Sequence, residues 1–275
     1  MIRANLLTVG WLCYTAVNIA QTTHSPLGTY HFTTGAYSKH FQDAFSMMAN
    51  AGALSSLGYF SIGVNGEQRF MLQQTGVYTA VATLPLNTGN LGLQADYSGY
   101  DDFNESQIGL GYGLQLNESI GIGAKFNYYH FRIPSYISTS SVNFEIGTMV
   151  HISDQLHTGV SVYNPLESPL GKNTGERLAA VYKAGIGYEW SSSFFTQLEI
   201  IKEKGRDINI HLGIQYKPLE QVLARAGVQT GNNAIYFGAG YLYRHFRMDV
   251  SVSMHQQLGV SPGIMLLYQL KKNEE

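Results

Sequence analysis

The chain has little charge, little proline and almost no cysteine for its 275 residues. Charged residues make up 13 % of the sequence, there are 7 prolines, and Cys13 is the only cysteine. An intrachain disulfide needs two cysteines, so a disulfide-stabilised fold is excluded. The formal net charge of −2 gives no strong field for attracting nucleic acid, and no nucleic-acid partner is expected.

Long apolar runs are also absent after the first twenty residues. The mean hydropathy is −0.08, so a bundle of membrane-spanning helices is not expected. The N-terminus differs, because the basic start ending at Arg3 is followed by a largely apolar stretch that ends at Ala20. This order is typical of a secretory signal peptide, here residues 1–20, with an N-terminal membrane helix as the less favoured interpretation.

What the chain does contain is alternation of apolar with small or polar residues, clearest over residues 107–131. Two arms of about ten residues flank a polar turn at residues 117–119, and their apolar face includes tyrosine. A period of two indicates strands, and ten residues is the length that a tilted strand needs to cross a bilayer. The stretch therefore predicts a transmembrane β-hairpin, and most of the chain repeats its pattern.

The repeated pattern predicts an all-β fold, a transmembrane antiparallel up-and-down β-barrel of about 14 strands over residues 57–270, followed by a periplasmic tail at 271–275. Short connections alternate with longer ones, as in barrels of the Gram-negative outer membrane. A soluble sandwich or lipocalin-like barrel is disfavoured, because it would have to hide many tyrosine-tipped outward faces. Strands are expected near 57–64, 77–84, 91–97, 107–116, 120–131, 142–151, 156–163, 180–189, 194–202, 208–216, 221–229, 234–243, 246–255 and 263–270.

Residues 21–56 precede the barrel, and apolar residues recur at helical spacing within residues 38–54. A helix starting near Ser38 or Asp43 is expected there. We interpret the segment as a plug inside the barrel lumen, because many inward glycines leave room for another element to approach. A surface helix on the periplasmic side is the alternative. The expected plug residues are Phe41, Asp43, Phe45, Met48 and Asn50.

Charged residues fall on the inward phase of several expected strands. Mixed signs inside a narrow barrel favour a structural network of salt bridges, with a polar conduit as the alternative. Lys125 and Glu145 are expected to be neighbours across one hairpin. The expected lumen network comprises Lys125, Glu145, Lys183, Glu189, Glu199, Arg225, Arg247 and Asp249.

No residue pattern supports catalysis, a cofactor or a metal. The glycine run at residues 109–113 lies inside an expected strand with no helix after it, so it does not match a nucleotide-binding loop. The nine histidines are scattered and lack metal-ligand spacing. We therefore expect no enzyme activity, no cofactor and no metal.

Two stretches resemble the start of the FadL/PorV superfamily of outer-membrane barrels in Bacteroidota, in particular its PorV/PorQ-like members. They are Phe41-Gln42-Asp43-Ala44-Phe45 and Asn50-Ala51-Gly52-Ala53-Leu54, and in the second the usual Asn-Pro-Ala is replaced by Asn50-Ala51-Gly52. DFNESQIGLGYG at residues 102–113 and VNFEIG at residues 142–147 add to the likeness. The resemblance implies a fourteen-stranded barrel.

The resemblance leaves two functions open. The polar lumen favours a non-enzymatic accessory subunit of an export or assembly complex, as in type IX secretion or the barrel-assembly machinery. The alternative is a FadL-like channel for hydrophobic small molecules, because Phe41, Phe45, Met47 and Met48 could line a small apolar pocket. Membrane lipid, lipopolysaccharide and a larger outer-membrane barrel are the expected partners, and a purely structural barrel is a third interpretation.

Overall fold

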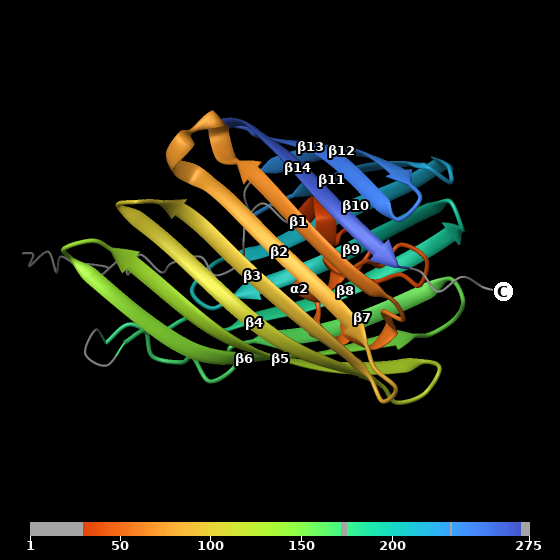
Figure 1. The fold of residues 1–275 in the computed structure, drawn as a ribbon, viewed down its shortest axis with the longest axis horizontal. Coiled ribbons are helices and arrows are strands. Elements are labelled where there is room, and N and C mark those ends of the chain that lie inside the picture. Colours follow the sequence, from red (N-terminus) through yellow and green to blue (C-terminus); the bar gives the residue numbers. More distant parts are fainter. Residues whose placement is uncertain (1–29, 172–174, 232, 271–275) are drawn as a thin grey trace, which may run out of the picture.

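A computed structural model of the chain describes residues 30–171, 175–231 and 233–270, and their strands close into one antiparallel barrel (Figure 1). Each strand pairs with its neighbours in chain order, and β1 pairs with β14. The strands are β1 (Phe60–Gln68), β2 (Gly76–Pro85), β3 (Asn90–Tyr100), β4 (Phe103–Gln115), β5 (Ile120–Ile133), β6 (Ile137–His151), β7 (Leu156–Tyr163), β8 (Val181–Ser191), β9 (Phe194–Glu203), β10 (Ile208–Leu219), β11 (Val222–Gln229), β12 (Ala234–Tyr243), β13 (Phe246–His255) and β14 (Gly259–Leu270). The expected fourteen-stranded up-and-down barrel is confirmed. The expected signal peptide and C-terminal tail lie outside the described residues.

Helices are few and short. They are α1 (Tyr30–Thr33), α2 (Ser46–Ala49) and the 3₁₀ helices η1 (Ala51–Ser56), η2 (Arg69–Met71) and η3 (Gln73–Thr75). Within the described residues, none of these helices has the length and apolar character needed to cross a membrane. The first three precede β1, and the last two connect β1 to β2.

The barrel exposes its apolar side chains and buries its polar ones, the reverse of a soluble protein. Leu110 is 58 % exposed and Phe126 67 % exposed on the outer surface, whereas Asn127 and Asn143 on the inner surface are 1 % and 2 % exposed. An apolar exterior is stable only against lipid, and a closed ladder leaves no strand edge unpaired there. The barrel is therefore built to span a membrane.

Strand boundaries differ most from the sequence prediction at the end of the barrel that carries the longer loops. Residues 132–140 were expected to form a link, yet β5 and β6 pair as far as Ile133 and Ile137, and only residues 134–136 turn. Outward positions on these extensions are polar, as at Arg132 and Ser138. The apolar alternation therefore stops before the hydrogen-bonded ladder does. The β5–β6 hairpin consequently projects well to the left of β10–β13 in Figure 1.

The described parts of the longest connection, residues 164–171 and 175–180, fold back over the barrel mouth. Leu170 and Leu178 are buried, and they pack with the inward rings of Tyr129 and Phe131 on β5. The Asn164 side-chain amide donates to the Leu178 carbonyl oxygen at 2.7 Å and fastens the two ends of the connection. This loop covers part of the mouth that we assign to the cell exterior.

The assignment of the two barrel ends can be tested with peptide tags. A tag inserted after Leu166, which is 70 % exposed, should bind antibody on intact cells, whereas a tag at residues 117–119 should bind only after the cells are opened. The reason is that outer-membrane barrels keep short turns in the periplasm. Flow cytometry measures both, and labelling of only the second tag on intact cells would reverse the orientation.

Candidate functional site: a segment enclosed in the lumen

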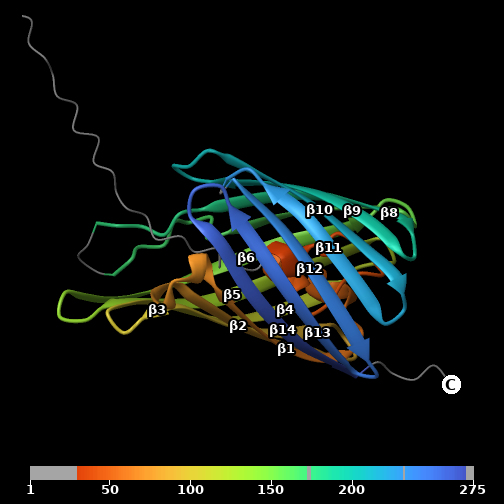
Figure 2. The ribbon, with the colours of Figure 1, turned by 90° about the horizontal axis from the view of Figure 1, so that it is seen from above.

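Residues 30–56, named here the lumen segment, lie inside the barrel before the chain enters β1. Figures 1 and 2 show the segment enclosed by strands in two perpendicular views. From Phe32 to Ser55 its residues are buried, except Lys39 and His40. The expected plug residues Phe41, Asp43, Phe45, Met48 and Asn50 are all among the buried ones.

The segment is only partly helical. Residues 38–54 were expected to form one helix, but α2 has four residues, η1 has six, and Asn50 between them is extended. The Ser38 hydroxyl accepts the backbone N–H of Phe41 at 2.9 Å as an N-cap would, but it closes an isolated turn, because α2 begins only at Ser46. Helical spacing in the sequence thus marked buried positions, while contacts with the barrel wall determine the backbone path.

A belt of inward glycines lets the segment approach the wall at backbone distance. A Cβ added to Gly111 would lie 2.7 Å from Leu54 Cδ1, and one added to Gly113 would lie 2.5 Å from Leu54 Cβ. Gly109 behaves differently, because its added Cβ would meet Asn127 and Lys125 of the wall. The glycines whose added Cβ would meet the lumen segment are Gly63, Gly92, Gly111, Gly113, Gly121, Gly123, Gly147, Gly159, Gly185, Gly187 and Gly213.

One side of the segment makes apolar contacts. Phe45, Met47 and Leu54 are fully buried, and they form one cluster with Val81 of β2 and Leu267 of β14. The ring centroids of Phe32 and Phe45 lie 5.8 Å apart within this cluster. Dispersion and hydrophobic contacts are non-directional, and the directional contact beside this cluster runs from the Asn90 side-chain amide of β3 to the Leu54 carbonyl oxygen at 2.7 Å.

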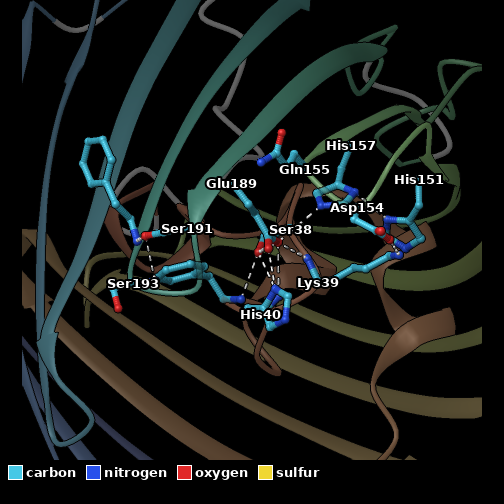
Figure 3. Close-up of polar contacts among 12 residues, drawn as sticks. Ser38, Lys39, His40, His151, Asp154, Gln155, His157, Glu189, Ser191 and Ser193 are labelled. Atoms are coloured by element: carbon cyan, nitrogen blue, oxygen red, sulfur yellow. Dashed lines mark hydrogen bonds and ion pairs between the residues drawn. The ribbon is translucent and has the colours of Figure 1, made fainter.

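The other side is fixed by directional polar contacts, the densest of which centre on Glu189 of β8 (Figure 3). The Glu189 carboxylate accepts the Ser38 hydroxyl at 2.5 Å and the Lys39 backbone N–H at 2.6 Å, and it also contacts His40 Nδ1. His157 Nε2 lies 3.3 Å from the same carboxylate. One carboxylate thus holds the turn at which the segment reaches the barrel end.

Histidines extend this cluster along the wall. His157 Nδ1 lies 3.0 Å from His151 Nδ1. For this hydrogen bond one of the two nitrogens must be unprotonated and accept the N–H of the other ring. Beyond them, Lys39 Nζ lies 3.6 Å from the exposed Asp154 carboxylate. Within the described residues, no set of three His, Cys, Asp or Glu side chains is arranged to hold a metal.

A second carboxylate holds the segment one residue earlier, at Tyr37. The Tyr37 hydroxyl donates to Glu199 Oε1 of β9 at 2.7 Å, and His211 Nδ1 lies 3.8 Å from the other oxygen. Burial raises the pKa of the Tyr37 phenol well above its usual range, and the Glu199 charge raises it further. Tyr37 therefore stays protonated and remains a hydrogen-bond donor.

Further contacts hold the helical part of the segment. Lys183 Nζ donates to the carbonyl oxygens of Met48 at 2.9 Å and Ala49 at 3.1 Å, where α2 ends. A cation at a helix C-terminus satisfies carbonyls that lack intrahelical partners. The Asn50 amide donates to the Thr148 carbonyl oxygen at 3.0 Å, which fastens the extended residue to β6.

Four buried charges join the segment to β11 and β13. Arg247 Nη2 donates to Asp43 Oδ2 at 2.6 Å, and Arg225 Nη1 donates to Asp249 Oδ2 at 2.6 Å. Arg247 Nε is also 3.1 Å from Asp249 Oδ1, so the two pairs form one neutral cluster. Removing a single member would leave a buried charge uncompensated, which is strongly destabilising.

Lys125 and Glu145 form the remaining pair. The register places them directly opposite each other, and their charged atoms are 2.9 Å apart with both side chains 3 % exposed. Lys125 also donates to Gln94 Oε1 of β3. This ion pair therefore connects two strands of the barrel wall, β5 and β6.

The expected lumen network is therefore divided. In the part of the chain that the structure describes, its eight residues fall into five sets of contacts, four of which hold the lumen segment. Tyr37 and Ser38 were not predicted as site residues, and residues 21–37 showed no periodicity that could have identified them. His157 was not predicted as a partner of Glu189, because strand pairing alone does not reveal that contact.

The glycine belt predicts a specific steric effect. Gly111→Phe should lower the free energy of unfolding by ~1–3 kcal/mol, because the ring would overlap Leu54. Gly66→Phe is the matched control, since Gly66 lies on the outer face of β1. Urea unfolding from lipid vesicles measures both. In a variant lacking residues 30–56 the Gly111→Phe cost should vanish, and its persistence there would show that the clash is not with the segment.

The Glu189 cluster predicts local loosening. Glu189→Gln should raise hydrogen exchange at residues 38–41 by roughly tenfold, because hydrogen bonds to a charged acceptor contribute about 1.5–3 kcal/mol and part of that is lost. Glu220→Gln, at an exposed turn, is the control. Mass-spectrometric exchange reads out the peptide. Unchanged protection would mean that apolar packing alone holds the turn.

Comparison with known proteins gives the fold and no family. No protein-family model matches the chain, and no curated protein matches it. Among solved structures, the Pseudomonas putida toluene transporter TodX is similar with a TM-score of 0.66 and 9 % identity, covering 88 % of this chain and 96 % of that one. The CymD monoaromatic hydrocarbon channel is similar with a TM-score of 0.62 and 13 % identity, covering 89 % of this chain and 96 % of that one.

These similarities support the barrel fold that the resemblance implies, and they give no link to Bacteroidota or to PorV-like subunits. The first of these structures is named a toluene transporter and the second a monoaromatic hydrocarbon channel. Their fold, together with the apolar exterior of this barrel, places the chain among outer-membrane β-barrels.

Proposed function

We propose that this protein is an outer-membrane channel for small hydrophobic molecules, kept closed by the lumen segment. The observation that carries the proposal is the apolar cluster between the segment and the β14–β1–β2 wall, which is larger than the other apolar clusters that the segment joins in the described lumen. A hydrophobic solute entering there would exchange one apolar contact for another. Passage on the opposite side would require breaking hydrogen bonds and ion pairs one by one.

The contrast between two phenylalanines in the segment locates the path. Phe45 packs in the apolar cluster, and a Cβ added to Gly63 of β1 would lie 2.6 Å from its ring. Phe41 stacks on Phe195 of β9 with centroids 5.5 Å apart, beside the turn that Glu189 holds. Phe45 therefore lies on the apolar side of the segment, and Phe41 lies on the side that Glu189 anchors.

The sequence hypothesis of an accessory subunit is now the second candidate. It rested on the polar lumen, but that polarity is directed largely at the chain's own N-terminal segment. The solved structures with the same fold are hydrocarbon channels, and they favour the transport alternative. A larger barrel partner in type IX secretion or barrel assembly stays a hypothesis for co-purification in mild detergent to test.

Uptake into proteoliposomes tests the proposal. Phe45→Ala should increase the uptake of a small aromatic hydrocarbon several-fold, because it vacates a volume in the apolar cluster. Phe41→Ala should change uptake little, since the anchors around it remain. Deleting residues 30–56 should leave a folded barrel and raise single-channel ion conductance, because the ladder closes without the segment.

Two results would contradict the proposal. Equal hydrocarbon uptake by Phe45→Ala and the unmodified protein would remove the apolar path. No hydrocarbon uptake by any variant, together with a stoichiometric barrel partner, would favour the accessory-subunit hypothesis.

A further inference from the structure

The outer surface of β4–β6 changes character along the barrel. Cross-strand pairing aligns outward residues of the three strands into rows, and successive rows pass from apolar to polar toward the end with longer loops. The two apolar rows are Leu110–Phe126–Phe144 and Ile108–Tyr128–Val142, and the two that follow, named here the polar rows, are Ser106–His130–Ser140 and Asn104–Arg132–Ser138.

The polar rows lie just beyond the hydrocarbon boundary. Outward residues of β5 are apolar from Ile120 to Tyr128, a span of about nine residues that matches a tilted membrane-crossing strand. Beyond Tyr128 the same face carries His130 and Arg132 while the ladder continues. These strands have 13, 14 and 15 residues, against 8 in β7 and in β11.

The walls at β10, β12 and β13 do not change in this way. At the same end of the barrel their outward residues stay apolar close to the strand ends, as at Ile208, Ile235 and Met254, whereas β9 carries one outward cation there, Lys202. The polar rows are therefore a local feature of β4–β6, and a general polar rim does not account for them.

The rows present one cation among hydroxyl and amide groups. Arg132 is exposed, and its guanidinium makes no hydrogen bond or ion pair with any residue that the structure describes. Ser140 Oγ lies 2.8 Å from the Tyr128 hydroxyl and 2.9 Å from His130 Nδ1. These contacts link Tyr128, at the end of the apolar span, to the first polar row. An exposed guanidinium can bind a phosphate in bidentate geometry, and neighbouring hydroxyls can bind sugars.

We propose that the polar rows bind the sugar–phosphate region of lipopolysaccharide, with Arg132 contacting a phosphate. The rows continue the lipid-facing surface outward, so the molecule beside them is the one whose acyl chains meet Tyr128 and Phe126. In the outer leaflet that molecule is lipopolysaccharide, and phosphates with sugar hydroxyls lie directly above its acyl chains. The inference concerns the outer wall and is independent of transport through the lumen.

Binding of lipid A to the detergent-solubilised full chain tests the phosphate contact. Arg132→Ser should weaken lipid A binding roughly three- to tenfold in native mass spectrometry, the effect of losing about one exposed charge–phosphate contact. Lys202→Ser is the matched control, because it removes an outward cation at the same end of β9. Equal binding by the two variants would overturn the phosphate contact, whether both keep or both lose lipid A.

A second pair of variants tests the sugar contact. Ser106→Leu combined with Ser140→Leu should weaken binding of lipopolysaccharide that carries its core sugars and spare lipid A without them. Thr148→Leu, at an outward position on β6 within the hydrocarbon span, should affect neither. Unchanged binding of the core-bearing form by the double variant would overturn the sugar contact. Loss of heat-modifiable gel migration in a variant would show misfolding, and Ser106→Ala with Ser140→Ala then replaces it.

Discussion

Every part of this structure depends on the requirement that backbone N–H and C=O groups facing lipid find partners within the chain. Hydrocarbon offers no water to bond them, and each unpaired group would cost several kcal/mol. The pairing of β1 with β14, from Phe60 opposite Leu270 to Glu67 opposite Gly263, removes the last two edges. Closure in turn encloses a lumen whose polar wall must also be satisfied.

The lumen segment meets that second demand. Its backbone amides and carbonyls, which a regular helix would have paired internally, bond instead to wall side chains such as Glu189 and Lys183. In the opposite sense, the Asn50 side chain of the segment donates to the Thr148 backbone carbonyl of the wall. The wall gains partners for charges that would otherwise be buried alone. Glycines on the wall make the exchange sterically feasible, because a Cβ at positions such as Gly113 would hold the segment away.

Sequence reasoning succeeded where one local rule governs the chain. Alternation with a period of two follows from the pleat, so fourteen strands could be counted, and the Lys125–Glu145 pairing followed from hairpin register. It failed where the determining contacts are distant in sequence. The turn at Ser38 depends on Glu189, about 150 residues away, and a local helical pattern could not reveal it. The extension of β4–β6 into the polar rows was missed for another reason. The prediction assumed that each strand ends where its membrane-spanning apolar alternation ends.

The lumen segment is covalently continuous with β1, and this has a consequence for the order of assembly. The barrel closes where its first strand, β1, pairs with its last strand, β14. If strands are added to the sheet in chain order, the segment is therefore attached to an edge that pairs last. A curved, open sheet can receive the segment against β4–β8 and then close, and no chain end has to be threaded through a finished pore. The segment would then act as an internal template for curvature, so the strands would close around a solid core.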